Sequence, residues 1–200
     1  SWPLLRLASL TFLLFWAAVS QAAAGDTVGE PSDTFCSYGL PWANASNTPF
    51  RLYKHWVHEG GIATPLVVHW PAGFEARGQW RSQPGHVIDV MATCLDVAAL
   101  EYPKEFQGRR PLPLEGKSLV PVLHGLERSG HDLLAWNCGQ GRAIQIENWK
   151  LVRLGDDQSW ELYNLDHDIG ETDNQASKFP ERVRLMTAKN ETWRSRVGAQ

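Results

Sequence analysis

Four short strand-like runs follow one another after Gly130, and few architectures can bury all of them. A turn separates each run from the next, and the runs occupy residues 133–136, 142–147, 150–154 and 160–163. Short runs joined by turns predict an antiparallel meander. The charged, amphipathic segment from Phe179 to Val197, with Pro180 near its start, predicts a helix that closes this small sheet.

The segment before Gly130 begins with a predicted helix. Thr48 can act as an N-cap and Pro49 suits the first helical position, so a helix is predicted over residues 50–58. Gly60 and Gly61 are predicted to end this helix, because glycine accepts the left-handed conformation of a C-cap.

The next elements have the pattern of an α/β fold. The apolar run over residues 62–70 predicts a strand buried on both faces, as in a parallel sheet. A helix is predicted over residues 86–100, where apolar residues recur at spacings of three and four. Cys94 lies on that apolar face and is predicted to be core. A shorter helix is predicted around residues 118–123.

The first residues of the chain have the layout of a secretory signal peptide. Arg6 precedes an apolar run from Leu7 to Val19, and three alanines at 22–24 offer a cleavage site before Gly25. The run is shorter than the roughly 20 residues that a membrane-spanning helix needs. We therefore expect a signal peptide over residues 1–24, no stable membrane span, and a secreted or periplasmic protein.

Charge and length bound the remaining chain. The formal net charge is −3, and no cluster of lysines and arginines stands out, which argues against a nucleic-acid partner. Two hundred residues suffice for one domain or somewhat more. We expect the C-terminal part of an α/β domain over residues 25–129 and a small α+β subdomain over residues 130–200.

Lys54 is the candidate functional residue. On the predicted helix it shares a face with Phe50, Val57 and His58, one turn before the two glycines. Its compact ammonium suits an oxyanion such as a sulfate, a phosphate or a developing alkoxide. The alternative is an ordinary solvated lysine, since most lysines are exposed.

A metal site in the same stretch is disfavoured. His55, His58 and Glu59 do not form an H-E-x-x-H pattern, and three ligands in one short turn rarely converge. No metal ligand is therefore predicted in this chain. Glu59 is expected to fix the turn instead.

Several stretches in the correct order resemble bacterial arylsulfatases. They read "SYGLPWANASNTPFRLYKHWVHEGGIATPLVVHWPAG", "HVIDVMATCLDVAALEYP", "PLEGKSLVPVL", "GRAIQIENWKLVRL" and "WELYNLDHDIGETDN". The resemblance covers the C-terminal portion of that family and spans about residues 37–196 here. It implies an α/β fold class: a partial alkaline-phosphatase-like α/β domain followed by a small four-stranded antiparallel sheet with a C-terminal helix.

The resemblance also implies a site. In the family, a cysteine or serine in a C/S-x-P/A-x-R motif becomes a formylglycine nucleophile, a calcium ion polarises the sulfate, and lysines and histidines hold its oxygens. The lysine of "RLYKHWVHEGG" is one of these, and it maps onto Lys54. Lys54 is thus expected to be a catalytic, substrate-binding residue. The expected ligand is a sulfated small molecule or glycan.

The sequence departs from the family in two respects. None of Cys36, Cys94 and Cys138 lies in the nucleophile motif, and the family's calcium-binding acids have no counterpart here. We expect an arylsulfatase-type sulfuric ester hydrolase present as a truncated chain, inactive alone. Two alternatives stay open: a non-catalytic accessory protein that binds sulfated ligands, and a phosphoesterase of the same superfamily.

Overall fold

The computed structural model describes residues 39–75 and 78–199, so the predicted signal peptide lies outside the described residues. The described residues form two compact units, one over residues 68–132 and one that joins residues 39–67 to residues 133–199. Their elements in chain order are α1 Leu40–Asn47, α2 Glu59–Ile62, α3 Asp89–Val97, α4 Val120–Leu123, β1 Leu134–Cys138, β2 Gly141–Ile146, β3 Trp149–Arg153, β4 Glu161–Asn164 and α5 Pro180–Val197.

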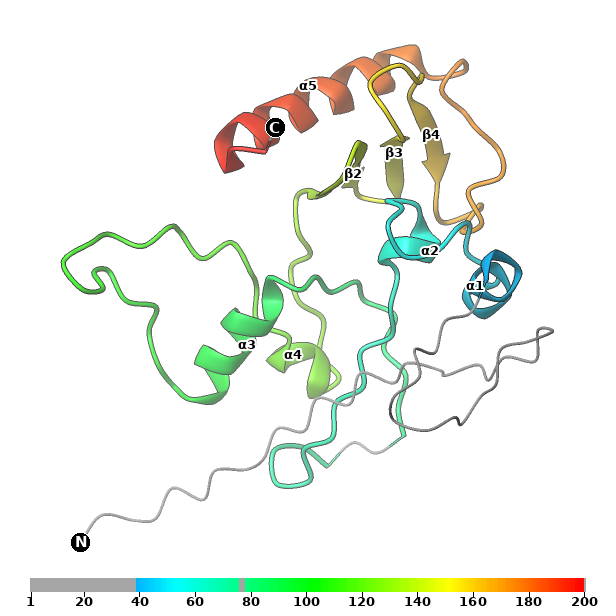
Figure 1. Ribbon diagram of the computed structural model, residues 1–200. Helices are drawn as coiled ribbons and strands as arrows, with labels where there is room; N and C mark the ends of the chain where they lie inside the picture. Colours follow the sequence, from blue (N-terminus) through cyan, green and yellow to red (C-terminus); the bar gives the residue numbers. More distant parts are fainter. Residues whose placement is uncertain (1–38, 76–77, 200) are drawn as a thin grey trace, which may run out of the picture. The chain divides into compact units, whose positions relative to one another are not determined.

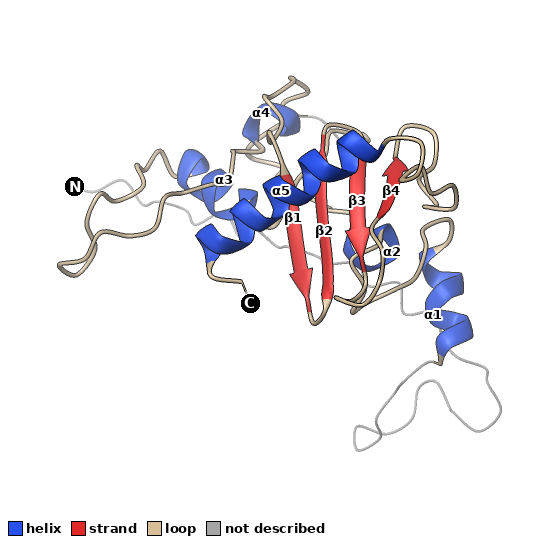
Figure 2. Ribbon diagram, turned by 90° about the horizontal axis from the view of Figure 1, so that it is seen from above, coloured by secondary structure: helices blue, strands red, loops and turns tan. Residues whose placement is uncertain are grey.

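The predicted meander is confirmed. The four strands form one antiparallel sheet in the order β1-β2-β3-β4, so every strand pairs with its neighbour in sequence (Figure 2). The register places Ile144 opposite Leu151, and Leu151 opposite Leu162. Short turns fix this register, and side chains alternate between the two faces.

Each face of the sheet packs against a different part of the chain. On one face, Ile144, Leu151 and Leu162 form a core with Met186 of α5. On the other face, Ala143, Val152 and Tyr163 pack around Val57, which comes from the segment before α2. Helices α5 and α2 accordingly lie on opposite sides of the sheet (Figure 1). The predicted closing helix is confirmed, with Pro180 in its first turn and Gly198 as a left-handed C-cap.

The predicted helix over residues 50–58 is wrong. Residues 48–58 form turns and bends, and Thr48 ends the preceding helix α1 rather than starting a new one. Gly60 and Gly61 lie inside α2 instead of ending a helix. A Cβ at Gly60 would overlap the carbonyl oxygen of Leu52, and one at Gly61 would overlap that of Trp56. These glycines permit close backbone approach, a tertiary requirement that the sequence pattern did not distinguish from a C-cap.

The predicted strand over residues 62–70 is also wrong. Ile62 ends α2, and residues 63–70 belong to no helix or strand. Leu66 and Val67 are each 47% exposed. A buried strand needs neighbours on both edges, and no strand in the described part of the chain pairs with this run.

The two helices of the unit over residues 68–132 are confirmed, although α3 is shorter than expected. It covers Asp89–Val97 and buries Asp89 and Ala92. The expected apolar face is wrong, because Met91 is 57% exposed and Cys94 is an exposed free thiol. Within the described ranges, no helix combines the length and apolar character required to cross a membrane.

Candidate functional site

Lys54 lies in an exposed turn, whereas the sequence predicted a helix at this position. The turn is closed by a hydrogen bond from the Trp56 N–H to the Tyr53 carbonyl oxygen at 3.1 Å. Within residues 39–75 and 78–199, the Lys54 ammonium takes part in no hydrogen bond or ion pair. A solvent-accessible cation on a defined turn can accept an anion without first breaking an internal contact.

The backbone on both sides of Lys54 is strained. Leu52 and His55 have φ angles of 64° and 84°, which residues other than glycine rarely adopt. Each such residue costs about 1–3 kcal/mol and persists only where surrounding contacts enforce it. The contacts that enforce this turn come from the residues immediately before and after it.

Arg51 anchors the turn on its N-terminal side. Its Nη1 donates to Glu161 Oε2 at 3.2 Å, to the Tyr163 hydroxyl at 2.8 Å and to the Glu171 carbonyl oxygen at 3.3 Å. Glu161 and Tyr163 belong to β4, so this guanidinium fixes the start of the turn to the edge of the sheet.

His58 anchors the turn on its C-terminal side. The side chain is fully buried, and its Nε2 lies 3.2 Å from Glu161 Oε2. Burial lowers the pKa of His58 to about 4, although the hydrogen bond to Glu161 opposes this. The imidazole is therefore neutral at pH 7, with the proton on Nε2 donated to the carboxylate. Burial alone would raise the pKa of Glu161, but hydrogen bonds from Tyr163 and His58 and the charge of Arg51 hold it below its usual value.

A buried triad of charged residues forms a third anchor. The Lys150 Nζ lies 2.6 Å from Glu59 Oε1 and 2.9 Å from Glu171 Oε1. Glu171 Oε2 accepts the Glu59 backbone N–H at 2.7 Å. Lys150 and Glu171 are fully buried, and the ammonium also lies 5.9 Å from the centre of the Trp136 ring. Burial raises the pKa of Glu171 despite the opposing charge of Lys150.

The sequence contained one signal for this triad that was missed. Lys150 lies two residues before Val152 on β3, so both side chains point to the same face of the sheet. Val152 faces the core around Val57. A lysine at an inward-facing strand position needs a buried acidic partner. The expectation that Glu59 fixes the turn agrees with its two contacts in the structure.

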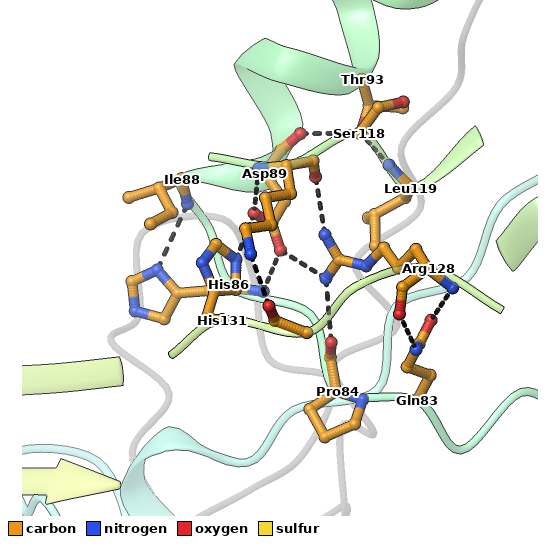
Figure 3. A network of polar contacts seen from close by, with 12 residues as sticks. Gln83, Pro84, His86, Ile88, Asp89, Thr93, Ser118, Leu119, Arg128 and His131 are labelled. Atoms are coloured by element: carbon orange, nitrogen blue, oxygen red, sulfur yellow. Dashed lines mark hydrogen bonds and ion pairs between the residues drawn. The ribbon is translucent and has the colours of Figure 1, made fainter. Parts of the chain in front are cut away.

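A second polar cluster, in the unit over residues 68–132, has a different character (Figure 3). Asp89 at the start of α3 accepts hydrogen bonds from the His131 Nε2 at 2.7 Å, the Lys117 N–H and Arg128 Nη2 at 2.8 Å each, and the His86 N–H at 2.9 Å. Burial would raise the pKa of Asp89, but these four donors lower it below its usual value.

This cluster joins loops, and its carboxylate has no free acceptor position. Arg128 also donates to the carbonyl oxygens of Lys117 and Pro84, while Gln83 bonds the backbone of Arg128. Both carboxylate oxygens of Asp89 carry two donors, so the group is saturated. We regard the Asp89 cluster as structural.

No calcium site is formed by the residues that the structure describes. Among them, no group of three or more histidine, cysteine, aspartate or glutamate side chains is placed to hold a metal ion. The buried carboxylates of Glu59 and Glu171 are both engaged by Lys150. The described donor set therefore does not fit the family's calcium ion.

The fold of the chain is similar to known structures. The chain is similar to the crystal structure of Ps i-CgsB with a TM-score of 0.58 and 22% identity, over 74% of this chain and 32% of that one. That protein has also been crystallised in complex with k-i-k-neocarrahexaose. This likeness shows the fold, helices with a four-stranded antiparallel sheet and a C-terminal helix as in alkaline-phosphatase-like α/β folds.

The family follows from the sequence comparisons. The chain belongs to the sulfatase family, because the family model "N-sulphoglucosamine sulphohydrolase, C-terminal" matches residues 50–194. It is 32% identical to an uncharacterized sulfatase of Schizosaccharomyces pombe over 155 residues, which are 74% of this chain and 28% of that protein. It is 33% identical to an arylsulfatase of Klebsiella aerogenes over 116 residues, 58% of this chain and 24% of that enzyme. The chain thus spans less than a third of the length of these relatives.

Proposed function

We propose that this chain carries the sulfate-contacting lysine and the C-terminal subdomain of an arylsulfatase-type sulfuric ester hydrolase. The observation that carries the proposal is the exposed Lys54 ammonium, which pairs with no residue that the structure describes and stands on a turn held by three anchors. In the resembling family, the lysine of the same motif holds a sulfate oxygen, and Lys54 occupies the corresponding position in "RLYKHWVHEGG".

The chemistry of Lys54 is electrostatic. An ammonium beside a sulfate ester stabilises the negative charge that grows on the sulfate and on the leaving oxygen. The backbone of the turn is held before the anion arrives, so only the lysine side chain has to be ordered on binding. In the family, formylglycine supplies the nucleophile and calcium polarises the sulfate. This chain's own contribution is to bind and orient one sulfate oxygen.

The substrate class follows from the family. The matched family model is named for a sulfated amino sugar, and a similar bacterial protein is named an arylsulfatase. The proposed ligand is therefore a sulfate ester on an aryl group or a saccharide. Because the sequence contains no C/S-x-P/A-x-R nucleophile motif, we propose that the chain alone binds such an ester without hydrolysing it.

The test is a binding titration with the full chain and Lys54→Ala. Inorganic sulfate and an aryl sulfate are titrated while the lysine side chains are followed by NMR with ¹³C-labelled lysine. We expect saturable binding that Lys54→Ala abolishes. Lys178→Ala is the matched control, because Lys178 is also exposed but belongs to the loop before α5. Equal binding by wild type and Lys54→Ala would overturn the proposal.

One observation also favours a purely binding role. Lys54 is accessible, and contacts within the chain hold the turn that carries it, so anion recognition does not depend on a nucleophile. Turnover assays separate the two functions: hydrolysis of an aryl sulfate by the purified chain would exclude a non-catalytic accessory role. A preference for inorganic phosphate over sulfate in the same titration would instead favour the phosphoesterase alternative.

A further inference from the structure

We propose that the buried Lys150–Glu59–Glu171 triad positions the Lys54 turn and thereby sets its affinity for an anion. This inference rests on the function proposed above for Lys54. It assigns a positioning role to three residues that do not touch the ligand themselves. Lys150 belongs to β3 and Glu171 to the loop after β4, so both lie far from Lys54 in the sequence.

The triad controls the exit of the turn. Glu59 follows the turn and begins α2, where it is held twice: its backbone N–H donates to Glu171 and its carboxylate accepts from Lys150. The α2 glycines press against the carbonyl oxygens of the turn, and the Gly60 N–H donates to the Arg51 carbonyl oxygen at 2.9 Å. Displacing Glu59 would therefore move α2 and the turn together.

Glu171 is itself held in place to make this contact. It has a φ of 53° and lies in a loop in which the Asp168 carboxylate accepts the N–H groups of Thr172 and Asp173 at 2.8–3.0 Å. A strained residue in a loop fixed by hydrogen bonds indicates that the inward direction of its side chain is enforced. The buried carboxylate is thus delivered to Glu59 and Lys150 by its own supporting contacts.

A buried triad of charges adds little net stability but specifies geometry. Desolvating three charged groups costs about as much as their attraction returns, and apolar replacements often serve folding equally well. The sheet also has an independent apolar core against α5, formed by Ile144, Leu151, Leu162 and Met186. The triad lies on the opposite face, which is the face that carries the Lys54 turn. Its specific contribution is therefore the position of the turn.

The experiment compares Glu171→Gln and Glu59→Gln with Glu181→Gln. The first two weaken the triad while keeping side-chain size, and Glu181 is the matched control because it lies exposed on α5. Three quantities are measured on the full chain: the inorganic sulfate affinity at the Lys54 Hε–Cε cross peak, the rate of tryptic cleavage after Lys54, and the thermal midpoint. The cross peak is assigned with Lys54→Arg.

We expect both triad variants to bind sulfate about tenfold more weakly. In these variants the turn is less ordered before binding, and ordering it on binding lowers the affinity. Cleavage after Lys54 should accelerate, since local opening exposes the turn to the protease. The thermal midpoint should stay near that of Glu181→Gln, because Lys150 keeps one of its two carboxylate partners in each variant. Unchanged affinity and cleavage would overturn the proposal. Loss of the whole fold in both variants would also overturn it, because the triad would then be a general stability element.

The outcomes separate this inference from the proposed function. If the wild-type Lys54 cross peak does not respond to sulfate, the proposed function fails, and the effect of the triad on anion affinity fails with it. If the cross peak responds equally in wild type and both triad variants, the function stands and the positioning role is refuted.

Discussion

The Lys150 ammonium lies 2.6 Å from Glu59 Oε1, and this contact joins β3 to the start of α2 beside the Lys54 turn. The ion pair is buried, with Lys150 fully enclosed and Glu59 12% exposed. Together with Arg51 and His58, it surrounds the turn on both sides with contacts to the sheet. A flexible lysine side chain is thereby mounted on a fixed backbone.

Gly60→Ala should destabilise the unit that contains the sheet. The new methyl group would overlap the carbonyl oxygens of Leu52 and Arg51, which are backbone atoms and cannot rotate away. We expect a loss of about 1–3 kcal/mol, typical of overpacking, together with loss of anion binding at Lys54. Chemical denaturation measures the first effect and the sulfate titration the second. Gly130→Ala is the control, because no atom lies within 4 Å of its added Cβ. Equal effects of the two substitutions would contradict this account.

His58 should make stability depend on pH between about 4 and 6.5. Its pKa is lowered from 6.5 to about 4 in the folded state, so the unfolded chain takes up the proton first as the pH falls. The free energy of unfolding is therefore unaffected by His58 above pH 6.5, and it declines by up to about 3 kcal/mol toward pH 4. Denaturant unfolding across this range measures it.

His58→Gln should flatten that pH dependence, because glutamine can still donate to Glu161 but does not titrate. His55→Gln is the control, because it replaces an exposed histidine in the same turn. Glu171 also makes stability depend on pH, but it is present in wild type and in both variants, so its effect cancels in the comparison. A slope that persists in His58→Gln would assign the titration to another group.

Asp89→Asn should destabilise the unit over residues 68–132. It removes a buried charge and leaves Arg128, whose side chain is 4% exposed, without its carboxylate partner. Breaking such a pair costs about 3–5 kcal/mol. Because the pKa of Asp89 lies below its ordinary value of 3.8, this stabilisation is present above that pH and is lost as the pH falls through the folded pKa. Amide hydrogen exchange of α3 measures the loss. Asp132→Asn, an exposed position, should leave exchange unchanged.

His55→Gly should stabilise the protein by up to about 1 kcal/mol, because glycine adopts a φ of 84° without steric cost. His124→Gly should have the opposite sign, since the φ of His124 is −85° and glycine gains nothing there. Thermal unfolding of both variants checks the prediction. If His55→Gly lowers the midpoint as much as His124→Gly does, the backbone at His55 is not strained.

The sheet subdomain was predictable because its signals are local. Strand runs, turns and the amphipathic stretch that became α5 each depend on nearest neighbours in sequence, and antiparallel strands joined by short turns pair in order. The same local reasoning failed for residues 50–58 and 62–70. The sequence alone does not distinguish a glycine that caps a helix from one that permits close approach of the backbone. The apolar run over residues 62–70 pairs with no strand among the described residues, so it forms no part of a sheet.

The sequence alone identified Lys54 as the candidate functional residue, because its motif resembles that of the sulfatases. The sequence also determined the antiparallel meander and its closing helix. Only the tertiary structure decided how Lys54 is presented. It replaced the predicted helix with a strained turn and brought Lys150 and Glu171 against Glu59. The physical reason is that a buried charge must find its counter-charge wherever the fold places one, and sequence distance carries no information about that meeting.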